Sequence, residues 1–123
     1  MTGERKLADF RQWTLAVLGL LSAESERQVA YLQETGVEVD EILLQFDEVL
    51  HVARARVADG SLKREDYILL QSINGSADSI SVGPDSVWTG SALGEAAEWE
   101  EIRAVSRVAK SSLERSWSQD FGG

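Results

Sequence analysis

The chain has 123 residues, of which 43% are hydrophobic and 27% charged, a balance that is typical of one folded domain and disfavours a disordered chain. Its 21 acidic residues outnumber 12 basic ones, and the net charge of −9 disfavours direct binding to nucleic acid or to an anionic membrane surface. No cysteine is present, which excludes disulfides, thiolate metal sites and a cysteine nucleophile.

The first predicted element is a helix over residues 7–21, because apolar residues recur there at three- and four-residue steps. Its most apolar run, Trp13 to Leu21, is far shorter than the roughly 20 residues that span a bilayer, so we expect a cytoplasmic protein without a membrane segment. A second helix is expected to be capped by Ser22 or Ser25, of which Ser25 forms a capping-box pattern with Gln28, and to end at Gly36.

The clearest element is a third helix of about twenty residues, from Val39 to a stop at Gly60. Its apolar side is formed by Val39, Ile42, Leu43, Phe46, Val49, Leu50, Ala53 and Val57. A fourth helix is predicted from Tyr67 to Ile80, although Asn74-Gly75 inside it allows two shorter helices as an alternative.

Residues 83–94 contain three of the ten glycines and the only proline, which predicts an ordered loop or a short helical turn. A last helix follows, with Trp99, Ile102 and Leu113 on its apolar side, and residues 118–123 are expected to form a frayed tail. No alternating pattern indicates a strand. The sequence therefore predicts an all-α protein in which residues 1–123 form a single compact bundle of about five helices.

Acidic residues are concentrated in two stretches of the chain. Residues 22–48 hold eight acids against one base, and residues 85–101 hold five acids and no base. Interaction of acids with helix starts, about 0.3 to 1 kcal/mol each, explains part of this pattern. The excess is interpreted as a surface that attracts a basic protein. The predicted partner-binding residues are Glu38, Asp40, Glu41, Asp47, Glu48, Asp85, Trp88, Glu95, Glu98 and Glu101.

The segments Val87-Trp88-Thr89, Ala92-Leu93, Glu98-Trp99 and Ile102-Arg103 resemble the C-terminal part of small acidic helical proteins of high-GC bacteria, some of which are immunity proteins for toxins. The likeness covers about a quarter of the chain. It implies a bacterial, non-catalytic inhibitor that covers a basic toxin or nuclease with its acidic surface. No cofactor or metal is expected for such a protein.

Three alternatives remain open at this stage. Acidity can serve only to keep a small protein soluble. A helical scaffold or adaptor that self-associates as a homo-oligomer through apolar stripes is a second hypothesis. A Mg²⁺-dependent all-α nucleotide pyrophosphatase is the leading enzyme hypothesis, with the pairs Glu38/Glu41 and Glu98/Glu101 as candidate ligands. His51, the only histidine, is three residues after Glu48, but a carboxylate-bridged metal site would need a second such pair.

Overall fold

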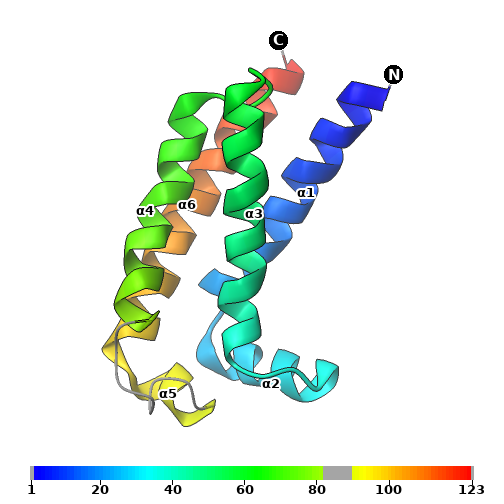
Figure 1. Ribbon diagram of the computed structural model, residues 1–123. Helices are drawn as coiled ribbons and strands as arrows, with labels where there is room; N and C mark the ends of the chain where they lie inside the picture. Colours follow the sequence, from blue (N-terminus) through cyan, green and yellow to red (C-terminus); the bar gives the residue numbers. More distant parts are fainter. Residues whose placement is uncertain (1, 82–89, 123) are drawn as a thin grey trace.

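The computed structural model describes residues 2–81 and 90–122, and these residues are all-α, without a strand. They form six helices (Figure 1): α1 (Thr2–Ser22), α2 (Ser25–Thr35), α3 (Asp40–Ala58), α4 (Arg64–Ser81), α5 (Gly90–Glu95) and α6 (Ala97–Gly122). The all-α prediction is confirmed, whereas the number of five helices is wrong. The additional helix, α5, begins within residues 83–94, for which an ordered loop or a short helical turn was predicted, and its Ala92 and Leu93 are buried.

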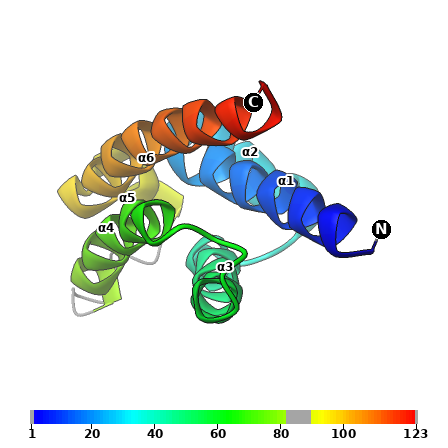
Figure 2. The same cartoon turned by 90° about the horizontal axis from the view of Figure 1, so that it is seen from above.

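The four long helices alternate in direction, so that each runs opposite to its neighbours (Figure 1). Viewed along the bundle, α4, α6 and α1 follow one another, and α3 lies on the other side of the core from α6 (Figure 2). The most extensive packing is of α6 against α4 and α1. The short helices α2 and α5 contact each other at the end of the bundle opposite the start of α1 and the end of α6.

Apolar side chains spaced at helical intervals form one core cluster, to which all the helices except α2 contribute fully buried apolar residues. The apolar side of α3 predicted from the sequence is buried from Val39 to Ala53, and Val57 packs against it. Trp99 and Trp117 are buried, and Trp13 is half-buried against the core. Helix α2 contributes Val29 and Leu32, which are partly buried against the core.

Three local expectations have a definite outcome. Helix α4 runs without interruption through Asn74-Gly75, so residues 64–81 form one helix and not two. The capping box of Ser25 with Gln28 is wrong, because Glu24 is the N-cap of α2 and Gln28 instead turns inward to other carbonyl groups. Helix α6 includes residues 118–122, which were expected to form a frayed tail.

Gly75 lies within α4 and Gly36 ends α2, so alanine should have opposite effects on stability at these two positions. Nothing lies within 4 Å of a Cβ added at Gly75, so Gly75→Ala should raise the free energy of unfolding by about 1 kcal/mol. Gly36 ends α2 with a φ of 70°, and Gly36→Ala should lower the same quantity by about 1 kcal/mol. Urea unfolding measures both, and shifts of the same sign would contradict this assignment.

A buried carboxyl group joins α4 to α6 near the end of the bundle where the chain termini lie. Asp66, in the first turn of α4, has only 3% of its surface exposed. Its Oδ1 accepts a hydrogen bond from Ser116 Oγ at 3.1 Å, and its Oδ2 accepts one from Trp117 Nε1 at 3.0 Å. Both carboxyl oxygens are therefore satisfied by side chains from one turn of α6.

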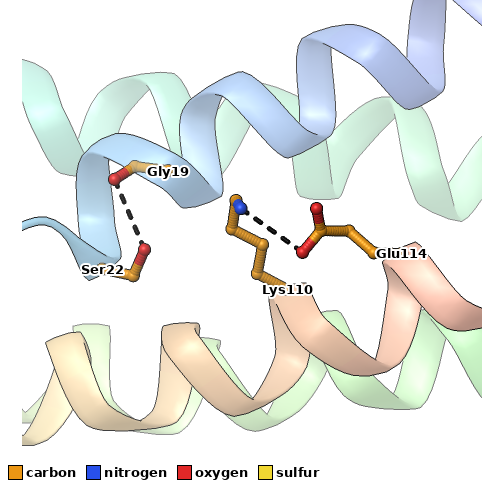
Figure 3. A network of polar contacts seen from close by, with 4 residues as sticks. All are labelled: Gly19, Ser22, Lys110 and Glu114. Atoms are coloured by element: carbon orange, nitrogen blue, oxygen red, sulfur yellow. Dashed lines mark hydrogen bonds and ion pairs between the residues drawn. The ribbon is translucent and has the colours of Figure 1, made fainter.

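Where α6 packs on α1, Gly19 of α1 lies beside the side chain of Lys110 of α6. The ammonium group of Lys110 pairs with Glu114 one turn along α6 at 3.3 Å, and its stem lies toward α1 near Gly19 (Figure 3). In the last turn of α1, Ser22 Oγ donates to Gly19 O at 3.3 Å. An exposed ion pair of this kind contributes little, so the aliphatic contact is its main role at the helix pair.

Candidate functional site

The structure brings the two acidic stretches of the sequence to the same end of the bundle. Helices α3 and α6 both begin there, and α2 and α5 lie there (Figure 1). We use the term acidic end for residues 22–41 and 90–103. These residues hold ten acidic residues against two basic ones, whereas the rest of the chain holds eleven against ten. Nearly all of the net negative charge therefore lies at one end of the molecule.

Most of the predicted partner-binding residues belong to the acidic end and reach solvent. Five of them are exposed or half-buried at the start of α3 or near the start of α6, and Glu95 is exposed at the last position of α5. The five are Glu38, Asp40, Glu41, Glu98 and Glu101. Asp47 and Glu48 are exposed farther along α3, outside the acidic end. Asp85 and Trp88 lie outside the described residues.

Gln28 and Arg103 hold the acidic end together. Gln28 is fully buried, and its Nε2 donates to Leu20 O at 3.0 Å and to Leu21 O at 3.2 Å, which satisfies carbonyl groups in the last turn of α1. Its Oε1 accepts a hydrogen bond from Arg103 Nη1 at 3.2 Å, and the same nitrogen donates to Leu93 O in α5. Four helices thus meet in one polar network.

One of the two basic residues at the acidic end, Arg103, has a structural role. Burial lowers the pKa of its guanidinium, an effect that the nearby charge of Glu100 opposes. An arginine with a lowered pKa still carries its charge at neutral pH. Arg103 therefore serves the contacts between helices, and Arg27 is the only exposed base among the residues of the acidic end that the structure describes.

An open groove of about 630 Å³ lies between α1, α2 and α3. Its α1 side carries Trp13 and four smaller or aliphatic residues facing α2, and its α2 side carries Tyr31. The hydroxyl of Tyr31 accepts a hydrogen bond from Gln45 Nε2 of α3 at 2.8 Å. The full lining is Trp13, Ala16, Val17, Gly19, Leu20, Ala23, Arg27, Ala30, Tyr31, Glu34 and Gln45.

Sequence reasoning missed this groove because it treated Trp13 only as the start of the apolar run that ends at Leu21. Trp13 is half-buried and packs against the core, but it also lines the groove. The short side chains Ala16, Gly19 and Ala23 at three- and four-residue steps along α1 were the available signal. Their lack of bulk is what leaves room beside Trp13.

The described residues contain no group of three or more histidine, aspartate or glutamate side chains placed to hold a metal ion. The pairs Glu38/Glu41 and Glu98/Glu101 are therefore not gathered into one such group. His51 is exposed on α3.

Comparisons with known proteins add no assignment. No family model, curated protein or solved structure matches the chain. The likeness to acidic immunity-type proteins thus stays an expectation from the sequence.

Two further surface properties bear on the alternatives. Among the described residues, no helix is both long and apolar enough to cross a membrane. The exposed large hydrophobic residues of the same part of the chain are Leu44, Ile68 and Val108, which lie on three different helices. These three residues therefore do not form a continuous apolar stripe on one helix.

Proposed function

We propose that this chain is a non-catalytic protein-binding module whose acidic end binds a basic protein. The most specific form of the proposal is an immunity-type inhibitor that covers the cationic surface of a toxin or nuclease. The observation that supports it is the gathering of nearly all the net charge at one end of the bundle, from two stretches that are distant in sequence.

The preference of helix starts for acidic residues accounts for only part of this charge. Asp40 and Glu41 lie in the first turn of α3 and Glu98 in the first turn of α6, where the helix dipole favours acids. Glu34 lies in the last turn of α2 and Glu95 ends α5, where the same dipole disfavours them. The acids at the ends of α2 and α5 are therefore not explained by the helix dipole and add to the negative potential of this end.

A concentrated acidic surface has a kinetic consequence. Negative potential extending over a Debye length of about 10 Å at 0.1 M salt steers a cationic partner and accelerates its association. The same negative potential repels acidic proteins and so disfavours their binding at this surface. Both effects suit an inhibitor that has to capture a harmful basic protein quickly.

The proposal predicts that neutralising the acidic end removes capture of a basic protein. Protein fixed through its C-terminus, at the opposite end of the bundle, is exposed to extract of its host at low salt, and bound proteins are eluted by salt and identified by mass. The wild type should retain a basic protein. The variant with Glu26, Glu38 and Glu100 changed to glutamine should bind it about tenfold more weakly, with a smaller dependence on salt.

The matched control removes the same number of charges elsewhere. Asp59→Asn, Glu65→Gln and Glu114→Gln change exposed acids outside the acidic end, and the amide oxygen that replaces the Asp59 carboxylate is still able to accept the N–H of Ser61. This variant should retain the partner. Equal loss of binding in both variants, or retention of no basic protein by the wild type, would count against the proposal.

A further inference from the structure

The groove between α1, α2 and α3 has an apolar floor that no other part of the described chain fills. One side of α1 from Trp13 to Leu20, continued by Ala23 just after the end of α1, forms its long wall, and Ala30 and Tyr31 of α2 face that wall. The hydrogen bond from Gln45 holds the ring of Tyr31 in place. From its first residue to its last the wall extends about 15 Å at the rise of an α-helix, or roughly three helical turns.

One acidic residue lines the groove, and three others lie one helical turn from lining residues. Glu34 lines the groove itself, and Glu41 and Glu48 lie one turn to either side of Gln45 on the same side of α3. Asp9 lies one turn before Trp13 on the same side of α1. Arg27 is the one basic residue in the lining. The groove thus combines apolar contact along its floor with negative charge along its edges.

We infer that the groove receives a cationic amphipathic helix of the protein partner. Such a helix places apolar side chains at steps of three and four residues onto the floor between Trp13 and Tyr31, while its lysines and arginines face Glu34, Glu41 and Glu48. The half-buried rings of Trp13 and Tyr31 are the expected anchor contacts. This inference rests on the proposed function and specifies the secondary structure of the partner segment that binds.

A second copy of the chain does not supply this helix. A helix that fills the groove needs several large apolar residues on one exposed side, whereas α3, α4 and α6 each expose one such residue in the described part of the chain. An extended strand is equally unsuitable, because the described helices offer no sheet edge for it to pair with.

The test uses a synthetic helical peptide of about 14 residues, roughly four turns, with leucine on one side and lysine on the other. A second peptide has the same composition but an order that leaves no apolar side. In nuclear magnetic resonance titrations the first peptide should shift the Trp13 indole N–H and the backbone signals of Gly19 and Tyr31. Shifts confined to residues outside the groove would overturn the inference.

Variants that fill the groove test whether the peptide binds through apolar contacts in the groove or through charge attraction alone. Ala16→Leu and Ala30→Leu place bulk in the groove without changing charge, and each should weaken binding of the amphipathic peptide about tenfold. Ala55→Leu is the control, because Ala55 is exposed on α3 and does not line the groove. Circular dichroism verifies that each variant is folded, and the titration of the wild type needs no variant.

The outcomes distinguish this inference from the proposed function. Equal binding of the two peptides, or unchanged binding by both filled variants, overturns the groove as the docking site and leaves the acidic end as a charged binding surface. The charge variant can also lose the host's basic protein while Ala30→Leu captures it as well as the wild type does. That result likewise rules out the groove as the docking site and leaves the acidic end as the binding surface. Failure of the charge variant to affect capture instead contradicts the proposed function.

Discussion

Asp66→Ala is expected to lower the free energy of unfolding by about 2 to 4 kcal/mol. The substitution removes the acceptor of two side-chain hydrogen bonds and leaves the indole N–H of Trp117 in the core without a partner. A buried unsatisfied donor costs about 1 to 3 kcal/mol by itself. Urea unfolding followed by circular dichroism measures the loss.

Asp78→Ala is the matched control, because Asp78 is on the same helix but exposed. It should change the free energy of unfolding by less than about 0.5 kcal/mol. A double-mutant cycle of Asp66→Ala with Trp117→Phe should show a coupling of about 1 to 2 kcal/mol. Purely additive effects would show that the hydrogen bond between α4 and α6 does not stabilise the fold.

Gln28→Leu is the second substitution with a large expected effect, a loss of about 2 to 4 kcal/mol in the free energy of unfolding. Leucine is apolar and similar in size, but it makes none of the three hydrogen bonds of Gln28. The carbonyl groups of Leu20 and Leu21 lose their side-chain donor, and Arg103 loses one acceptor in a half-buried setting. Hydrogen exchange should become faster in α2, and urea unfolding measures the total loss.

Gln33→Leu, at an exposed position of the same helix, is the control for Gln28→Leu. It introduces the same residue without removing a buried network and should leave stability within about 0.5 kcal/mol of the wild type. An equally small effect at position 28 would mean that α2 is held by Val29 and Leu32 alone.

The elements that could be predicted from the sequence are those whose signal is local. The apolar period of α3 and the glycine stops at Gly36 and Gly60 specify helices through neighbouring residues only. The continuity of α4 through Gly75 needed tertiary information, because its neighbours Ile73 and Ala77 pack into the core and outweigh the low helix propensity of glycine.

Buried polar residues were not predictable, because their partners are distant in sequence. Gln28 fits a capping box by spacing, yet its partners are the end of α1 and Arg103, 75 residues away. Asp66 fits a helix start, and nothing near it in the sequence indicates the bond to Trp117. Local patterns assign such residues to solvent, whereas the packed bundle gives them partners inside.

The candidate site divides in the same way. The individual acids were identified from composition, but their meeting at one end follows from the alternating directions of the long helices, which place the starts of α3 and α6 together. The groove was not predicted, because the spacing of Ala16, Gly19 and Ala23 indicates short side chains but not which helices lie beside them. Trp13 packs against the core and also lines the groove.

The position of α6 between α1 and α4 has a consequence for biosynthesis. The ribosome releases α1 long before α6, so the apolar side of α1 that later meets α6 stays uncovered while about 75 residues are added. The core is therefore complete only after the final helix has been synthesised. A nascent chain halted before Ala97 would expose apolar surface to chaperones and proteases.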